Sequence, residues 1–274
     1  MRWTFTSDPE VYAGAAEQWL LREPVRNTIQ LTMLRALREG LWSEDPLMGW
    51  AADPGGEIVA AALHAPPQLL MLADMPAEAV RELATALIEA ERPVLGVRGG
   101  VALAEAFAAA WWRPERTRRS ERLYRLDTLT PPPARPRGAP RTAGTQDLEL
   151  LVAWGQAFQR EAGGHSSGGL AAVLAGRVGR REILLWEVEG RPVAYAGASV
   201  PIGGVSRVGP VYTPPGERGR GYGTAVSHAV TARAREWGAA EVLLFTDLSN
   251  PVSNSIYRTI GYRPVADYAS IVFG

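Results

Sequence analysis

The sequence of 274 residues contains no cysteine and no lysine, so all 29 of its basic residues are arginine. The lack of cysteine excludes disulfides, thiolate metal sites and a cysteine nucleophile with its acyl-cysteine intermediate. The lack of lysine excludes lysine chemistry. No apolar run is long enough to span a membrane, and residues 1–8 lack the apolar core of a signal peptide. These absences favour a cytoplasmic protein without a membrane partner.

An excess of charge of either sign is also absent. The 29 acidic residues balance the 29 basic ones, so the overall charge does not indicate a nucleic-acid partner. Arginines are frequent in residues 113–122, but Glu115 and Glu121 dilute them, and we expect a solvated strand there rather than an RNA-binding patch. No group of histidines and carboxylates has metal-ligand spacing, and no metal is expected.

Prolines are concentrated between residues 129 and 140, where five of them exclude a helix or an internal strand and favour an extended spacer. We therefore predict a first domain at residues 1–130, a proline-rich linker at 131–141 and a second domain at 142–274. The alternative is a long surface loop within a single domain.

The two sides of this linker resemble each other. Trp50 and Trp186 each lie in the first strand of a predicted hairpin that follows two helical stretches, and Arg113 and Arg263 each precede a proline after a further predicted helix. The second side is longer than the first between these two landmarks. We interpret the pattern as a tandem repeat of one fold, with chance similarity between two alanine-rich segments as the alternative.

The extra length includes a glycine-rich loop. Residues 211–224 read as a strand that breaks into a loop with Gly219, Gly221 and Gly223, followed by a helix. Alternating glycines let a backbone approach an anion closely, and the helix start adds free N–H groups, so the loop predicts a diphosphate site. A Rossmann loop would need glycine where Thr224 stands, and a Walker loop would need lysine. Around Pro76, the matching place in the first copy, no glycine is found.

Two ordered motifs carry a family resemblance. Arg218, Gly221 and Gly223 form the first, and the second runs from Asn250-Pro251 to Tyr257, ahead of Gly261-Tyr262. With a strand before the loop and a helix after it, residues 145–274 resemble the GNAT superfamily of acyl-CoA-dependent N-acyltransferases. The resemblance implies an α/β (α+β) protein of two GNAT-like domains, each a mixed, mostly antiparallel central sheet flanked by helices. The first copy would be degenerate, without a CoA motif.

The resemblance also implies the donor, acetyl-CoA, and the residues that bind it. Backbone N–H groups of the glycine loop would hold the pyrophosphate, and the strand before the loop would pair with the pantetheine arm. The implied cofactor-binding residues are Val211, Tyr212, Thr213, Arg218, Gly219, Arg220, Gly221, Tyr222, Gly223, Thr224, Asn250 and Tyr257. Arg218 and Arg220 are alternatively solvated surface arginines, and Asn250 is alternatively a helix cap.

Tyr257 is the implied catalytic residue, because its hydroxyl would protonate the departing thiolate. A phenol of pKa ~10 and a thiol of pKa ~8.5 make that transfer uphill by about 2 kcal/mol. Alternatively, Tyr257 only packs on the cofactor. The first copy has Phe107 at the matching place, which has no proton to give.

The acceptor side is less defined. A primary amine of pKa ~10.4 costs roughly 4 to 5 kcal/mol to neutralise at pH 7, yet the strand before the glycine loop carries no acid that could serve as a base. The remaining candidates are Glu161, His165, Glu187 and Asp247. Glu161 and His165 belong to a segment that lines the acceptor pocket in the family.

We expect acetyl transfer to a primary amine, favouring a small-molecule acceptor, by a monomer or homodimer. A non-catalytic acyl-CoA-binding module is the alternative. His64 and His228 lie in apolar sequence surroundings and are expected to be packing or surface residues.

Overall fold

The computed structural model describes residues 2–41, 45–161 and 169–274, and its contacts divide the chain into two compact units. We call Met1–Arg122 with Ala266–Gly274 the first unit and Leu123–Val265 the second unit. The domain boundaries at 131–141 stay a prediction. The contacts add one feature that the sequence did not suggest, since residues 266–274 pack with the first unit.

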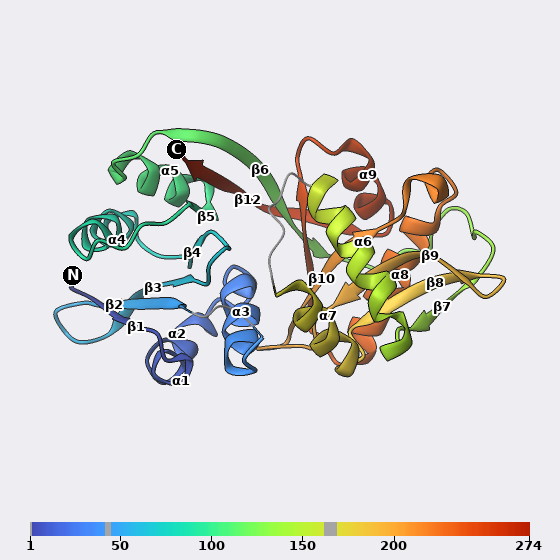
Figure 1. Ribbon diagram of the computed structural model, residues 1–274, viewed down its shortest axis with the longest axis horizontal. Helices are drawn as coiled ribbons and strands as arrows, with labels where there is room; N and C mark the ends of the chain where they lie inside the picture. The colour runs from blue at the N-terminus through green and yellow to red at the C-terminus, as the bar shows by residue number, and fades with distance from the viewer. Residues whose placement is uncertain (1, 42–44, 162–168) are drawn as a thin grey trace. The chain divides into compact units, whose positions relative to one another are not determined.

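The elements of the first half of the chain follow one another in a strand-helix-hairpin pattern (Figure 1). They are β1 (Arg2–Thr6), α1 (Pro9–Tyr12), the π-helical turn η1 (Ala13–Glu17), α2 (Gln18–Leu20), α3 (Thr28–Arg38), β2 (Leu47–Ala52), β3 (Ile58–His64), β4 (Leu70–Leu72), α4 (Ala77–Glu89), β5 (Gly96–Gly100), α5 (Val101–Ala110) and β6 (Glu115–Leu126).

The second half repeats this order. Its elements are β7 (Ala139–Thr142), the 3₁₀ turn η2 (Thr145–Asp147), α6 (Leu148–Glu161), α7 (Leu170–Gly179), β8 (Ile183–Val188), β9 (Arg191–Ala198), β10 (Val205–Tyr212), the 3₁₀ turn η3 (Pro215–Glu217), α8 (Tyr222–Glu236), β11 (Glu241–Asp247), α9 (Pro251–Thr259) and β12 (Tyr262–Phe273). Trp50 in β2 and Trp186 in β8 occupy matching strands, so the predicted repeat is confirmed.

Each unit contains a mixed sheet in which most neighbouring strands run antiparallel, as predicted. In the first unit the order is β1-β2-β3-β4-β5-β12, and only β4 and β5 of the paired strands with known register are parallel. In the second unit the order is β7-β8-β9-β10-β11-β6, and β10 with β11 is the parallel pair. Both β6 and β12 cross the bounds of the units, so each of these two strands contributes residues to both units.

Strand alternation builds two cores on the sheet of the second unit. Leu185 and Tyr195 pack with α6 and α7, whereas their chain neighbours Leu184, Ala194 and Ala196 pack with α8 and α9. Successive strand residues point to opposite faces, so strands that are apolar at every position must be covered on both sides. The glycine loop leads into α8, so the packing of α8 on the sheet fixes the position of the first turn of that helix.

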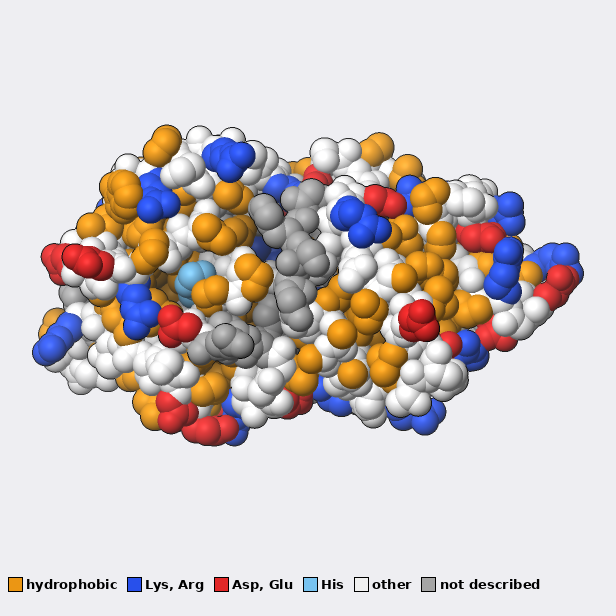
Figure 2. Space-filling model, viewed as in Figure 1, with side chains coloured by type: hydrophobic (Ala, Val, Ile, Leu, Met, Phe, Trp, Pro, Cys, Tyr) orange, Lys and Arg blue, Asp and Glu red, His pale blue; other side chains and the backbone are white. Residues whose placement is uncertain are grey.

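The arginine-rich strand β6 is exposed along its first residues and is laced with ion pairs. Arg118 bonds the carboxylates of Glu105 and Glu115, and Arg122 makes two bonds of 2.6 and 2.8 Å to Asp267. Among the described side chains on the face in Figure 2, positive and negative groups are interspersed. The segment is a solvated strand, as predicted. In the described part of the chain, no helix has the length and apolar character needed to cross a bilayer.

Candidate active site

The site begins where β10 and β11 separate. Their parallel pairing runs from Val205 opposite Glu241 to Val208 opposite Leu244. Both strands continue, to Tyr212 and Asp247, but no further pair joins them along these described residues. The strands diverge there, so after Val208 the edge of β10 that faces β11 has no described strand partner, and an extended ligand can pair with it. The Gly209 carbonyl on this stretch already accepts a hydrogen bond of 2.7 Å from Arg177, and Pro210 has no N–H.

The glycine loop follows directly and opens onto the first turn of α8. Gly219 and Gly221 have φ angles of +76° and +81°, in the left-handed region that glycine adopts without strain. Gly221 is the N-cap of α8 and has no side chain to satisfy the first N–H groups of the helix. A Cβ on Gly223 would lie 3.3 Å from the Thr213 hydroxyl, so this position is also tight. The loop thus offers unsatisfied donors and the positive end of the helix dipole to an anion.

A cavity of about 480 Å³ lies beside the start of α8. It is lined by Pro132, Pro133, Ala134, Gly221, Thr224, Pro251, Val252, Ser255, Ile256 and Thr259. One wall is the predicted proline-rich linker, and the other is α9. Pro136 of the same segment lies 3.9 Å from the place of a Cβ on Gly221. The segment therefore borders the glycine loop, a role that its composition did not indicate.

The two arginines of the loop are engaged by carboxylates. The Nη2 of Arg218 donates to Glu161 Oε2 at 2.6 Å, and its Nε donates to the carbonyl of Thr213 at 2.9 Å. Arg220 donates to Glu217 at 3.0 Å. Both side chains are about half exposed, so these ion pairs are weak enough to be exchanged for a bound phosphate.

Glu161, the last residue of α6, joins the loop to the end of β10. Besides Arg218, it accepts a hydrogen bond of 3.2 Å from the Tyr212 hydroxyl. The pKa of Tyr212 is raised, first by burial and then by the neighbouring carboxylate. The second acceptor-site candidate, His165, lies outside the described residues.

Tyr257 lies on α9, one residue after the cavity-lining Ile256, and is 8% exposed. Its ring meets Tyr262 edge-on at 6.1 Å, and burial raises its pKa to about 12. A hydroxyl of that pKa stays protonated at neutral pH but is a poorer acid than the sequence suggested. Full transfer to a thiolate of pKa ~8.5 becomes uphill by about 5 kcal/mol, so a strong hydrogen bond is the cheaper form of assistance.

The two asparagines of the second motif organise the start of α9. Asn250 is its N-cap and accepts from the Ser253 backbone N–H at 3.0 Å. Asn254 donates to the carbonyls of Asp247 and Asn250 at 2.9 and 2.7 Å, and accepts from the Tyr124 hydroxyl at 3.1 Å. Both side chains therefore hold the helix against the end of β11, and a contact of Asn250 with a cofactor stays a prediction.

Two further carboxylates were candidate bases. Glu187 on β8 bonds Arg141, which also holds Asp147, so this residue belongs to a network at the β7 edge of the sheet. Asp247 ends β11, at the point where β10 and β11 have separated, and accepts from Ser249 at 2.7 Å. Because β10 and β11 are parallel, Asp247 at the end of β11 lies at the same edge of the sheet as the glycine loop that follows β10.

The matching place in the first unit is filled by side chains of that unit. The carbonyl of Leu72, at the end of β4, accepts from Gln30, and the backbone N–H of Asp74 donates to Asn27. Trp3 donates to the carbonyl of Ala79 in the first turn of α4. This backbone is therefore already hydrogen-bonded in the first copy, and in the second copy Arg177 on α7 likewise donates to the Gly209 carbonyl of β10 at 2.7 Å.

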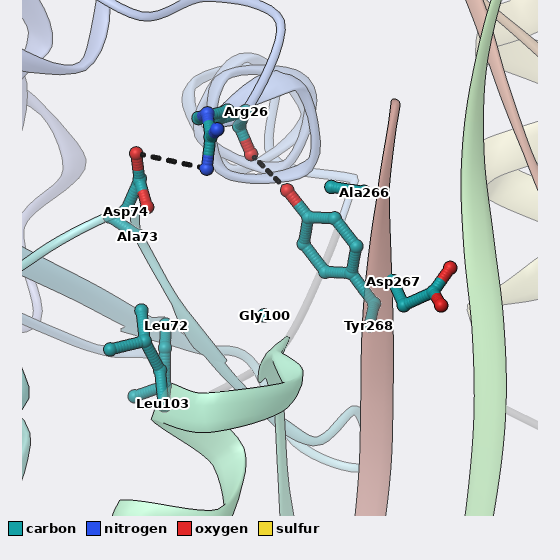
Figure 3. A pocket seen from close by; sticks show the side chains of 9 residues that line it. All are labelled: Arg26, Leu72, Ala73, Asp74, Gly100, Leu103, Ala266, Asp267 and Tyr268. Carbon is teal, nitrogen blue, oxygen red and sulfur yellow. Dashed lines mark hydrogen bonds and ion pairs between the residues drawn. The ribbon is translucent and has the colours of Figure 1, made fainter. Parts of the chain in front are cut away.

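A small cavity of about 70 Å³ remains near this place in the first unit (Figure 3). The Tyr268 hydroxyl donates to the Arg26 carbonyl across it at 3.2 Å, and Arg26 pairs with Asp74 at 3.6 Å. Phe107, the counterpart of Tyr257, is fully buried and stacks on Trp111 and Phe273. This place therefore has neither a cavity as large as that of the second copy nor a hydroxyl at the position of Tyr257.

In the described residues, no three or more His, Cys, Asp or Glu side chains are grouped to hold a metal ion. His64 is buried on β3, as expected, and its pKa is lowered mainly by burial. His228 lies on α8 one turn after the cavity-lining Thr224. It is partly buried, in agreement with the expectation of a packing or surface residue.

Comparisons with known proteins agree with this geometry. Residues 150–262 match the model of the acetyltransferase (GNAT) family. The comparison with curated proteins finds no match.

Three solved structures share the fold over nearly the whole chain. A GCN5-related N-acetyltransferase from Sphaerobacter thermophilus is 19% identical with a TM-score of 0.65, covering 98% of this chain and 94% of that one. A GNAT-family acetyltransferase from Colwellia psychrerythraea is 12% identical with a TM-score of 0.64, covering both chains fully. A tandem GNAT protein from the clavulanic acid biosynthesis pathway is 14% identical with a TM-score of 0.59, covering 98% of each chain. Residues 150–262 thus match the GNAT acetyltransferase family, and the chain as a whole has the fold of tandem GNAT proteins.

Proposed function

We propose that the second unit transfers an acetyl group from acetyl-CoA directly to a primary amine of a small molecule. The observation that carries the proposal is the glycine loop at the start of α8, placed at the diverging ends of β10 and β11 and beside an apolar cavity. No other described place in the chain combines these three features.

The residues present fit the chemistry of CoA. Uncapped N–H groups at Gly221 to Thr224 suit a diphosphate, and the open backbone of β10 suits the amides of pantetheine. The cavity wall of prolines, Val252 and Ile256 suits the adenosine face. The bound thioester supplies the activated acyl group, and Tyr257 is the hydroxyl on the helix that borders this cavity.

Tyr257 is proposed to hydrogen-bond the sulfur as negative charge develops on it. The hydroxyl remains protonated because its pKa is about 12, and its buried position strengthens a bond to a charged acceptor. Glu161 is our candidate to attract the cationic amine, which gives one proton to solvent before it attacks the thioester carbon. As the C–N bond forms and the C–S bond breaks, the second amine proton goes to solvent and CoA leaves as the thiolate. The Glu161 carboxylate lies at the end of β10, held by Tyr212 and Arg218.

We expect Glu161→Gln to raise the KM of the amine about fivefold, since an ion pair at a half-exposed carboxylate is worth ~1 kcal/mol. The affinity for CoA should change little or rise, because Arg218 is then free for phosphate. Steady-state kinetics with the amine varied, together with calorimetry of CoA binding, measure the two effects. The matched control is Glu189→Gln, which removes a carboxylate paired with Arg137 in a remote hairpin. Equal KM values in both variants would remove Glu161 from the acceptor site.

The proposed activity is tested by thiol release over a panel of small amines. CoA freed only with particular amines, in an amount equal to the acetylated product, supports the enzyme. The absence of an acid on β10 keeps a second candidate open, an acyl-CoA-binding module without turnover. Tight binding of acetyl-CoA with no release of thiol for any amine would favour that module.

A further inference from the structure

Two nitrogen-bearing side chains that the site described above does not use lie close in the chain to residues that line the apolar cavity. Pro132, Pro133 and Ala134 line the cavity, and the next residue in the chain is Arg135. On α8, Gly221 and Thr224 line the cavity, and His228 follows Thr224 by one helical turn. Residues four apart lie on the same face of a helix, so His228 continues the cavity-lining stripe.

Arg135 and His228 are close enough to interact. The pKa of His228 is lowered, first by partial burial and then by the positive charge of Arg135. Among the residues that the structure describes, no carboxylate pairs with Arg135. Its neighbour Arg137, by contrast, pairs with Glu189. Arg135 is exposed and His228 is partly buried, so a guanidinium and an imidazole are both accessible to a doubly charged anion.

The distance of His228 from the glycine loop along α8 indicates which phosphate group could lie beside it. Four helical residues rise ~6 Å, which is comparable to the size of one ribose. An adenosine whose 5′-diphosphate sits at the start of α8 would occupy the apolar cavity, and a phosphate on its 3′ oxygen would reach the level of His228.

We propose that Arg135 and His228 bind the 3′-phosphate of CoA and so make the site selective for CoA over its 3′-dephosphorylated form. This inference rests on the proposed function, because it assumes the diphosphate in the glycine loop. Arg135 forms charge-assisted bonds to the phosphate oxygens, and His228 donates an N–H from its imidazole. The proline-rich segment then acts as a wall of the cofactor site that carries its own phosphate ligand.

The test compares the affinities of CoA and dephospho-CoA by calorimetry in the full-length chain. We expect the wild type to bind CoA about 10- to 100-fold more tightly than dephospho-CoA, the range of one or two hydrogen bonds to a charged group. Arg135→Gln and His228→Gln should each reduce that preference, and the double variant should abolish it. The affinity for dephospho-CoA should stay within about twofold throughout. Arg137→Gln is the matched control, since it removes an arginine two residues away that already has a carboxylate partner.

The outcomes separate this inference from the proposed function. If the wild type binds CoA and dephospho-CoA equally, or if the double variant keeps the full preference, the phosphate site is overturned while the glycine-loop site stands. If the wild type binds neither compound, both proposals are wrong. Adenosine 3′,5′-bisphosphate provides a second readout. It should raise the melting temperature of the wild type and not that of the double variant, and an equal shift in both would count against the site.

Discussion

Replacing Tyr257 by phenylalanine is expected to lower kcat about 100- to 1,000-fold, the usual range for loss of one fixed hydrogen-bond donor to a developing negative charge. The affinity for acetyl-CoA should change less than about threefold, because the ring that packs beside Tyr262 is retained. The substitution installs the side chain that the first copy already has, Phe107. Since burial raises the Tyr257 pKa to about 12, the wild-type rate should show no alkaline loss from this hydroxyl between pH 7 and pH 10.

The matched control is Tyr262→Phe. Tyr262 lies in the same core, and its hydroxyl is 2.8 Å from the Thr231 hydroxyl, away from the cavity lining. This variant should lose about 1 kcal/mol of unfolding free energy and retain most of its kcat. Single-turnover measurements of thiol release on both variants decide the matter. If Tyr257→Phe keeps more than half of the wild-type rate, Tyr257 is only a packing residue.

Replacing Gly221 by valine should abolish CoA binding measurable by calorimetry, a loss of at least about 100-fold. A β-branched residue at φ +81° is strained by about 1–2 kcal/mol, and its side chain would project toward Pro136 and the cavity. The strain would displace the uncapped N–H groups relative to one another, and a diphosphate must bond several of them at once. The thermal unfolding midpoint should fall by only a few degrees, since the loop is exposed.

A second variant distinguishes loss of the binding site from a failure of α8 to form. Gly223→Val keeps ordinary helical geometry but places its Cβ against the Thr213 hydroxyl, so it should also weaken CoA binding while α8 remains formed. Gly216→Val is the control, because a Cβ at Gly216 meets no atom within 4 Å. Unchanged CoA affinity in both loop variants would show that the glycines are not the diphosphate site.

The sequence was sufficient for the order of elements and for the glycine loop at the start of α8. Apolar strands flanked by helical patterns, with Trp50 and Trp186 in matching hairpins, predicted a repeat that the structure confirms. The glycine spacing at 219, 221 and 223 predicted the tight loop at the start of a helix, because only glycine adopts these φ angles freely. Both patterns depend on residues that are close together in the chain, so a single sequence is enough to recognise them.

What the sequence did not reveal depends on contacts between distant residues. The pairing of the last strand, β12, with β5 is a choice of partner that no local pattern encodes. The partner of Arg218 is a carboxylate 57 residues earlier, at the end of another helix. The five prolines predicted an extended segment correctly, but extension does not say which surface the segment touches.

The central claim is that one of the two copies, the second, binds acetyl-CoA. The first copy has Gln30 and Asn27 on the backbone after β4 and a cavity of about 70 Å³, whereas the second has the glycine loop at the start of α8 and a cavity of about 480 Å³. Calorimetric titration of the full-length chain with acetyl-CoA tests this claim most directly. The account predicts one site per chain, lost completely in Gly221→Val. Two sites per chain, a site that survives in Gly221→Val, or no binding at all would contradict it.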